Sequence, residues 1–287
     1  MRNCLVLFVL SVCFGSFVLA QDTIRITCVG NSITEGYGLA NPETEAYPAQ
    51  LQQMLDTQFF VSNFGVSART MLKHGDLPYW NEVQFTNALE SNPNIVIIKL
   101  GTNDSKRYNW NSYGHEYVSN YTEMIRLFRE LDSKPEIYIC TAIPGQNMEW
   151  DIYNSYITDS LNPRILDVAF ELGVSVIDLY SLFKGRESEL LLQDSVHPNI
   201  QGAAVFATEV AKCIMHSKPD IISMNGSLLA PEAYGYQWYC NGVRVSDEDG
   251  GQDRECIPEK EGMYTVLIQF DETCLNMIVT NEYVYKF

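Results

Sequence analysis

The chain has 287 residues, of which 46% are hydrophobic and 19% charged, so it holds enough apolar material for a sizeable core. This composition excludes intrinsic disorder, collagen-like repeats and a coiled coil. Nineteen Lys and Arg residues stand against 36 Asp and Glu residues, which gives a formal net charge of −17. Such an excess of negative charge opposes binding to nucleic acid or to an anionic membrane surface, and neither is expected as a partner.

The first twenty residues have the pattern of a secretory signal peptide. Arg2 is positively charged, residues 4–20 are uncharged and mostly apolar, and Ala20 ends the run in a short side chain of the kind that a signal peptidase reads. A transmembrane anchor is the alternative, but the run falls short of the ~20 strongly apolar residues that a span needs. We therefore predict a signal peptide at residues 1–20 and a secreted, periplasmic or cell-surface protein without a membrane span.

Six cysteines follow the predicted signal peptide. Cys28 and Cys140 lie inside apolar runs, where a buried thiol is expected. Cys240, Cys256 and Cys274 fall in the C-terminal segment and allow one disulfide with one cysteine left over, in a pairing that the sequence leaves open. No Cys-x-x-Cys or His-x-x-x-His spacing occurs, so we predict no metal site.

Five short apolar, β-branched runs alternate with stretches of helical period over residues 24–216. Continuous apolar runs are typical of strands buried on both faces, and the alternation of strand and helix predicts a parallel sheet covered by helices. The predicted strands are Ile24–Val29, Phe59–Phe64, Ile95–Leu100, Ile137–Ile143 and Val174–Leu179. The predicted helices are Tyr47–Leu55, Tyr117–Leu131, Ile165–Leu172 and Ala203–Ile214.

The character of the sequence changes after Lys218. Helical period ends, and three runs typical of strands, separated by hairpin and loop signals, follow at Tyr236–Tyr239, Met263–Phe270 and Met277–Tyr285. We predict one domain at 21–218 and a second, small all-β domain at 219–287, which weakly resembles the immunoglobulin-like modules of secreted bacterial proteins. Trp238 and its neighbouring tyrosines either pack the core of this domain or form a platform for a sugar ring.

The loops after the predicted strands carry the candidate chemistry, because ligands bind at the carboxyl ends of the strands in an open α/β sheet. Ser32 follows the first strand in a turn flanked by glycines, and taken alone it fits a helix N-cap as well as a nucleophile. Gly65 follows the second strand, where the missing Cβ lets a backbone N–H approach a substrate. Asn103 follows the third strand and can offer an amide donor.

Asp194 precedes His197 by three residues, just before the last predicted helix. A single turn of chain can orient the imidazole through the carboxylate, which is the arrangement that a serine nucleophile needs. Each loop taken alone is a weak signal. Together, and in chain order, Ser32, Gly65, Asn103 and the pair of Asp194 and His197 resemble the four motif blocks of the SGNH or GDSL hydrolase family.

The resemblance extends over nearly all of residues 22–216. It implies an α/β, flavodoxin-like three-layer fold with a five-stranded parallel sheet. One position departs from the family pattern, since Asn31 stands where the family usually has Asp. An Asn oxygen can still accept the backbone hydrogen bonds that shape the turn, so we expect the same geometry with altered electrostatics beside Ser32. Three further segments are similar to the sialate O-acetylesterase-like branch of carbohydrate esterases: Ala46–Leu51, Ala142–Pro144 and Val176–Leu179.

The same resemblance implies a role for each motif residue. Ser32 would be the nucleophile, His197 the base, and Asp194 the group that holds the tautomer and stabilises the imidazolium. The backbone N–H groups of Ser32 and Gly65 and the Asn103 side chain would form an oxyanion hole, in which each donor is worth roughly 2.7–4 kcal/mol. The implied protein is a secreted serine esterase that removes O-acetyl or similarly small acyl groups from a carbohydrate through an acyl-enzyme, without metal or organic cofactor.

Substrate contacts and competing functions complete the prediction. His74 follows the second block and could line the rim of the cleft and contact the substrate. Lys106 and Arg107 follow the third block and either meet a substrate carboxylate or form a solvated face. Trp80, Trp110 and Trp150 either stack on a sugar ring or pack, and the sequence does not separate the two roles. A lipid or aryl esterase on the same fold is one alternative and would prefer longer acyl chains. A non-catalytic glycan-binding or adhesion protein is the other and would bind sugar without turnover.

Overall fold

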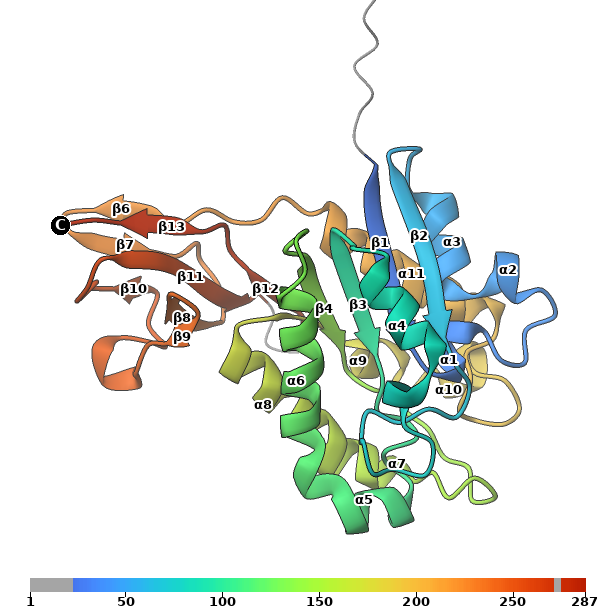
Figure 1. Cartoon of the computed structure of the whole chain (residues 1–287). Coiled ribbons are helices and arrows are strands. Elements are labelled where there is room, and N and C mark those ends of the chain that lie inside the picture. Colours follow the sequence, from blue (N-terminus) through green and yellow to red (C-terminus); the bar gives the residue numbers. More distant parts are fainter. Residues whose placement is uncertain (1–22, 271–274) are drawn as a thin grey trace, which may run out of the picture.

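A computed structural model describes residues 23–270 and 275–287, and its central feature is one sheet with helices on both faces (Figure 1). Five parallel strands follow the order β2-β1-β3-β4-β5, the order of a flavodoxin-like doubly wound sheet. The predicted α/β fold with a five-stranded parallel sheet is therefore confirmed. These strands are β1 (Ile24–Gly30), β2 (Phe59–Gly65), β3 (Ile95–Lys99), β4 (Glu136–Cys140) and β5 (Ser175–Ile177).

Strand register brings the loops of the predicted site to one edge of the sheet. Gly30, at the end of β1, pairs with Gly65 on β2 and with Lys99 on β3, so these three strands end at the same level. All five residues of β3 are buried, as its continuous apolar run predicts. The loops that follow the three strands consequently open side by side.

Helices cover the sheet on both faces and complete the three layers (Figure 1). One core cluster joins α3 and α11 to one face, and a second joins α4, α6 and α8 to the other. The helix α11 begins three residues earlier than predicted, because the Asn199 side chain accepts the N–H of Gly202 and caps it. The helices are α1 (Ser32–Glu35), α2 (Pro42–Glu45), α3 (Tyr47–Met54), α4 (Val83–Glu90), α5 (Arg107–Tyr113), α6 (Tyr117–Arg129), α7 (Asn154–Tyr156), α8 (Asn162–Leu172), α9 (Leu179–Phe183), α10 (Glu187–Leu190) and α11 (Ile200–Met215).

The C-terminal strands form a β layer, part of which continues the central sheet, whereas β6, β7 and β10 form a separate three-stranded sheet in the order β10-β7-β6. Met277 on β12 pairs antiparallel with Val176 on β5, so the sheet runs on through β12, β11, β8 and β9. Trp238 is fully buried and donates from its indole to the Asp253 carbonyl, so it packs a core and offers no platform for a sugar. The strands are β6 (Ile222–Met224), β7 (Ser227–Leu229), β8 (Gly235–Cys240), β9 (Val243–Arg244), β10 (Glu255–Cys256), β11 (Gly262–Gln269), β12 (Met277–Val279) and β13 (Tyr283–Tyr285).

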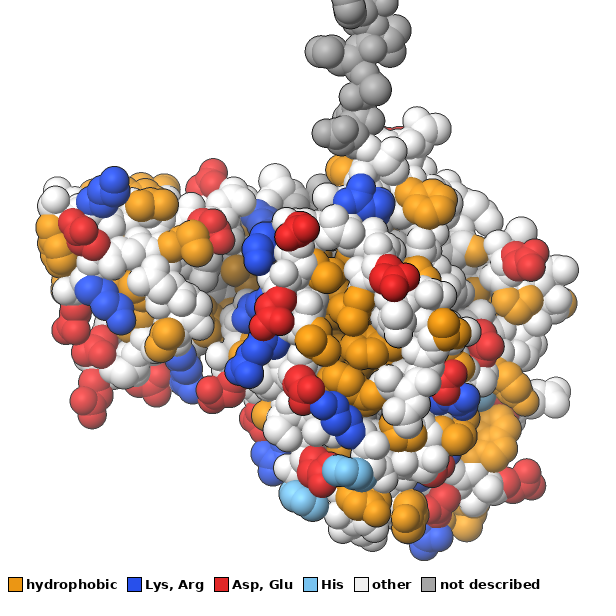
Figure 2. All heavy atoms as spheres, viewed as in Figure 1, with side chains coloured by type: hydrophobic (Ala, Val, Ile, Leu, Met, Phe, Trp, Pro, Cys, Tyr) orange, Lys and Arg blue, Asp and Glu red, His pale blue; other side chains and the backbone are white. Residues whose placement is uncertain are grey.

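Basic side chains gather where the β layer meets the helical part (Figure 2). A cavity of about 420 Å³ at this junction is lined by Arg129, Lys134 and Lys218, among others. Lys218 pairs with Glu136 at 2.6 Å, and Arg129 donates to the Leu172 carbonyl at 2.6 Å. Both contacts lie within the α/β part of the chain, so Lys218 and Arg129 already have partners there.

The predictions of a signal peptide and of a C-terminal disulfide involve residues that the structure does not describe. The predicted signal peptide at residues 1–20 and Cys274 lie outside the described residues. Within them, none of the five cysteines forms a disulfide, Cys240 and Cys256 included. No helix in the same ranges is long and apolar enough to cross a membrane.

Candidate active site

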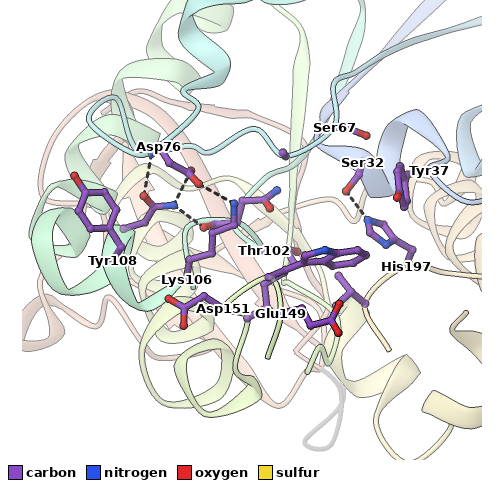
Figure 3. Close-up of a pocket in the computed structure, with 16 residues that line it drawn as sticks. Ser32, Tyr37, Ser67, Asp76, Thr102, Lys106, Tyr108, Glu149, Asp151 and His197 are labelled. Atoms are coloured by element: carbon purple, nitrogen blue, oxygen red, sulfur yellow. Dashed lines mark hydrogen bonds and ion pairs between the residues drawn. The ribbon is translucent and has the colours of Figure 1, made fainter. Parts of the chain in front are cut away.

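A cleft of about 520 Å³ opens at the carboxyl ends of the parallel strands. Figure 3 shows Ser32, Tyr37 and His197 at one end of it and Asp76 with Lys106 at the other. The lining comes from loops that are distant in sequence, which the sheet brings together. This is the position that ligands occupy in open α/β folds.

The turn that carries Ser32 depends on its neighbours. Ser32 is the first residue of α1, and Asn31 caps this short helix by accepting the N–H of Ile33 at 3.1 Å. Gly30 has no room for a side chain, because a Cβ there would lie 2.0 Å from Thr34 Oγ1. Asn31 thus shapes the turn as expected and places a neutral amide, not a carboxylate, next to Ser32.

The imidazole of His197 connects Ser32 to Asp194. Its Nε2 lies 2.7 Å from Ser32 Oγ (Figure 3), and its Nδ1 lies 2.9 Å from Asp194 Oδ2. The other oxygen of Asp194 accepts the backbone N–H groups of Val196 and His197, both at 2.9 Å. Because the carboxylate is fixed by its own turn, it favours the tautomer with the proton on Nδ1, which leaves Nε2 to accept the proton of Ser32.

Burial and hydrogen bonding set the protonation of this pair. Burial lowers the pKa of His197 below its ordinary value of 6.5, and the hydrogen bond and charge of Asp194 only partly oppose this. Burial alone would raise the pKa of Asp194, but the N–H groups of His197 and Val196 stabilise the carboxylate, and the net pKa lies below its usual range. At neutral pH the pair is therefore a carboxylate and a neutral imidazole, the states that a general base needs.

Gly65 lies outside the cleft, which corrects its predicted role in an oxyanion hole. Its N–H donates to the Asn63 side chain at 2.9 Å and is not turned to Ser32. The position needs glycine because α1 packs directly against it: a Cβ there would lie 2.2 Å from the backbone nitrogen of Glu35. The missing side chain thus serves the packing of β2 on α1.

Ala68 takes the place in the cleft that the sequence assigned to Gly65. It lines the cleft with a φ of 65°, in the left-handed region that favours glycine. The backbone N–H groups of Ala68 and Ser32 have no acceptor among the described residues. Asn103 also lines the cleft and donates one of its two amide hydrogens to the Arg69 carbonyl at 3.2 Å, which leaves the other available. Three donors are thus available to an anion in the cleft.

The strained backbone of Ala68 gives a testable expectation. Ala68→Gly keeps the N–H and adopts this φ without strain, so the free energy of unfolding should stay within about 1 kcal/mol of the wild type. Ala68→Val should lower it by about 1–3 kcal/mol, because a β-branched residue resists φ above zero. Thermal unfolding of both variants measures the difference. Equal stability of the two would contradict the left-handed conformation.

Hydrogen bonds hold the loop of Asn103 in place. The fully buried Asn109 donates to the Asn103 carbonyl at 2.9 Å and to Asp76 Oδ1 at 2.8 Å. The buried carboxyl group of Asp104 accepts the N–H of Leu72 at 2.7 Å, from the segment that follows β2. The loop after β3 and the segment after β2 are therefore tied together, which fixes the amide of Asn103 relative to Ser32.

Two of the predicted substrate contacts are occupied by partners within the protein. Lys106 lines the cleft, but its ammonium pairs with Asp76 at 2.8 Å. Arg107 is not part of the lining and pairs with Asp151 at 2.7 Å. Neither cation is left free to receive a substrate carboxylate without losing its present partner.

His74, the third predicted contact, lies outside the cleft. Its side chain is two-thirds exposed, and its Nδ1 lies 2.7 Å from a carboxylate oxygen of Glu116. The ring also packs beside Tyr113, with centroids 5.7 Å apart. Its place is on the outer surface near the start of α6.

Two aromatic rings lie beside His197: that of Trp150, one of the tryptophans that the sequence offered for stacking on a sugar, and that of Tyr37, which the sequence did not single out. The ring centroid of Tyr37 lies 4.6 Å from that of His197, and the ring of Trp150 lies 5.4 Å away, edge to face. Both residues line the cleft, whereas Trp80 and Trp110 pack against the core. An aromatic residue in a loop gives no sequence signal of this proximity, because only the fold brings residues 37 and 150 to residue 197.

The chain belongs to the GDSL-like lipase/acylhydrolase family, whose model matches residues 28–205. The matched segment contains the loops after β1, β2 and β3 and the pair of Asp194 and His197. The membership confirms the prediction of the family and of a carboxylic ester hydrolase as the class of enzyme.

Comparison with individual proteins gives one relative in sequence and several in fold. An acetylxylan esterase from Xylanibacter ruminicola is 40% identical over 211 residues, which cover 68% of this chain but only 44% of the relative. The structures of a carbohydrate acetylesterase family member from Sinorhizobium meliloti and of an aryl esterase from M. smegmatis each cover 67% of this chain, with TM-scores of 0.53. The matches include 97% of the S. meliloti chain at 20% identity and 99% of the M. smegmatis chain at 18% identity. At these identities the two matches establish the SGNH hydrolase fold alone.

Proposed function

We propose that this protein is a serine esterase that removes acetyl groups from a neutral glycan. The observation that carries the proposal is the hydrogen-bonded series of Ser32, His197 and Asp194 at the end of a cleft that also offers unpaired N–H donors. Acyl transfer requires a serine nucleophile, a base beside it, a group that orients the base, and donors for the oxyanion.

In the first half of the proposed reaction, Ser32 Oγ attacks the carbonyl carbon of the ester, and its proton passes to His197 Nε2. The carbonyl oxygen becomes negative and accepts hydrogen bonds from the N–H groups of Ser32 and Ala68 and from the Asn103 amide. Collapse of the tetrahedral intermediate breaks the bond to the sugar oxygen, which takes the proton from His197. The acetyl group remains bound to Ser32.

In the second half, water replaces the sugar. His197 Nε2 accepts a proton from the water as its oxygen attacks the acetyl carbon, and the same donors stabilise the second oxyanion. Collapse breaks the bond to Ser32 Oγ, which takes the proton back from His197, and acetic acid leaves as acetate and a proton. Asp194 stays ionised throughout and stabilises the imidazolium in both halves.

The charges of the cleft favour a neutral sugar over an acidic one. Lys106 is neutralised by Asp76 and Arg107 by Asp151, whereas Glu149 lines the cleft without an ion pair among the described residues. A uronic or sialic acid carboxylate would thus meet net negative charge. The name of the relative, an acetylxylan esterase, also supports an acetylated neutral polysaccharide, although this chain spans only 44% of that protein.

Export is part of the proposal, because a polysaccharide is met outside the cytoplasm. It is supported by the charge and apolar pattern of residues 1–20. Expression of the full chain with and without residues 1–20, followed by fractionation, measures it. Retention of both forms in the cytoplasm would contradict export.

The proposed activity is tested with residues 21–287 and a panel of esters. Acetate release is expected from an aryl acetate and from acetylated xylan, with lower kcat/KM on esters of sugars that carry a carboxylate. Aryl esters of increasing acyl length should be hydrolysed progressively more slowly. A preference for long chains would indicate a lipid or aryl esterase, and sugar binding without turnover would indicate a binding protein.

The pH dependence follows from the protonation of His197. The imidazole must be neutral to accept the proton of Ser32, and burial lowers its pKa below 6.5. We expect kcat/KM to rise with pH through a midpoint below 6.5 and to be fully developed at neutral pH. Rates on an aryl acetate over a pH series measure this midpoint. A midpoint above 6.5 would contradict the buried, neutral imidazole.

A further inference from the structure

Lys99 is a fully buried lysine at the end of β3, directly below the cleft. The other four residues of the strand are Ile or Val. In the part of the chain that the structure describes, the Lys99 ammonium makes one hydrogen bond, to Thr102 Oγ1 at 2.9 Å. Within the described ranges it has no ion pair with a carboxylate. A lone buried ammonium is costly to desolvate, and an apolar side chain of the same length would fill the space without that cost.

The surroundings of Lys99 leave its charge largely uncompensated. The titratable groups that face it are Cys140 at the end of β4, Asp104 in the loop after β3 and His197. Burial keeps the Cys140 thiol protonated by raising its pKa well above the usual range. Asp104 uses its oxygens to accept the N–H groups of the segment after β2, and burial raises its pKa to about 7.

The position of the ammonium connects it to the reacting groups. Thr102, which accepts its hydrogen bond, lines the cleft and directly precedes Asn103. The positive charge of Lys99 also contributes to the lowered pKa of His197, next to the opposing charges of Asp194 and Glu35. The charge therefore acts on the site through a protein interior of low dielectric, where an electrostatic interaction is stronger at a given distance than it is in water.

We propose that Lys99 is a positioning residue of the esterase reaction, whose buried ammonium holds Thr102 beside Asn103 and stabilises the negative charge that forms on the ester oxygen. The inference rests on the proposed function. A fixed charge that is already desolvated needs no reorganisation when the oxyanion forms, which is how preorganised groups lower a barrier. Lys99 acts through the loop and the field and does not contact the substrate.

The charge of Lys99 is predicted to depend on pH. Burial lowers its pKa to about 8, so the ammonium is present at neutral pH and is lost as the pH rises through this value. In the wild type, kcat should therefore fall at pH values above about 8. This alkaline limb adds to the acid limb that belongs to His197.

The test compares Lys99→Met, which keeps an unbranched side chain one atom shorter and removes the charge, with Thr102→Val, which removes the hydrogen bond and keeps the charge. The assay is acetate release from an aryl acetate over a pH series, with thermal unfolding measured in parallel. Lys99→Met should lower kcat roughly ten-fold or more, remove the alkaline limb and move the acid limb to higher pH, while the protein remains at least as stable. Thr102→Val should retain the alkaline limb.

The outcomes separate this inference from the proposed function. Absence of turnover by the folded wild type would refute the function itself. Turnover with unchanged kcat and pH limbs in folded Lys99→Met would show a purely structural lysine. If Lys99→Met does not fold, the wild type decides: an alkaline limb near pH 8 with the strong temperature dependence of an amine supports the proposal, and its absence or the weak dependence of a carboxyl group overturns it.

Discussion

Replacing Ser32 with alanine should lower kcat for acetate release by roughly 10⁴- to 10⁶-fold, because removal of the nucleophile leaves only the oxyanion donors and substrate binding to assist water. His197→Ala should cost about as much. The double variant should be no slower than either single one, since the two side chains act as one unit through their 2.7 Å hydrogen bond. Single-turnover rates on an aryl acetate measure all three.

The stability of these variants shows whether the loss of activity comes from the missing catalytic group or from unfolding. Ser32 is buried, and among the described residues its side chain bonds only to His197, so alanine leaves the cap formed by Asn31 and the turn intact. The melting temperature should change by only a few degrees. Ser119→Ala, on the exposed side of α6, is a matched control that should keep full activity. Near-normal turnover by folded Ser32→Ala would exclude the acyl-enzyme mechanism.

The sequence was sufficient to predict the parallel strands and the series of Ser32, His197 and Asp194. Buried strands are marked by continuous apolar runs, and their order along the chain with intervening helices restricts the topology. Where a boundary differs, a side chain explains it. The strand β5 ends at Ile177, before the predicted end, because Asp178 turns the chain by capping α9 through the N–H of Ser181.

The last predicted strand was harder to place because it is interrupted where its pairing with β11 is interrupted. The predicted run Met277–Tyr285 is divided into β12 and β13, both paired with β11. Three residues, 280–282, stand opposite residues 265 and 266 between the two ladders, so the extra residue forms a bulge. The apolar pattern of one strand does not show how many residues of the neighbouring strand stand opposite it, so it cannot predict a bulge.

The oxyanion donor and the buried cation could not be found by pattern for a related reason. Gly65 is the residue that a sequence suggests for close approach of a backbone, yet the element that approaches it is α1. Ala68 adopts a glycine-like φ without being glycine, and Lys99 lies near the end of the predicted strand Ile95–Leu100, where a lysine is as readily solvated as buried. In each case the residue type is compatible with several environments, and only tertiary contacts select one.

Replacing Asp194 with asparagine should lower kcat by about 10⁴-fold with little loss of structure, because the imidazole is then held in the wrong tautomer. The Asn oxygen would keep accepting the N–H groups of Val196 and His197, which now bond to Oδ1 at 2.9 Å. Its NH₂ group would then face His197 Nδ1 and donate to it. The proton of the neutral ring would move to Nε2, which could no longer accept that of Ser32.

Two measurements distinguish this tautomer effect from a loss of folding or of substrate binding. KM for an aryl acetate should change far less than kcat, since Asp194 bonds to the turn and the imidazole. Nitrogen chemical shifts of His197 should report the proton on Nδ1 in the wild type and on Nε2 in the variant. Asp167→Asn, which removes an exposed ion pair with Arg164 on α8, is the matched control and should behave as wild type. Wild-type kcat in Asp194→Asn would mean that the carboxylate neither sets the tautomer nor stabilises the imidazolium, and the proton would then have to reach His197 by another route.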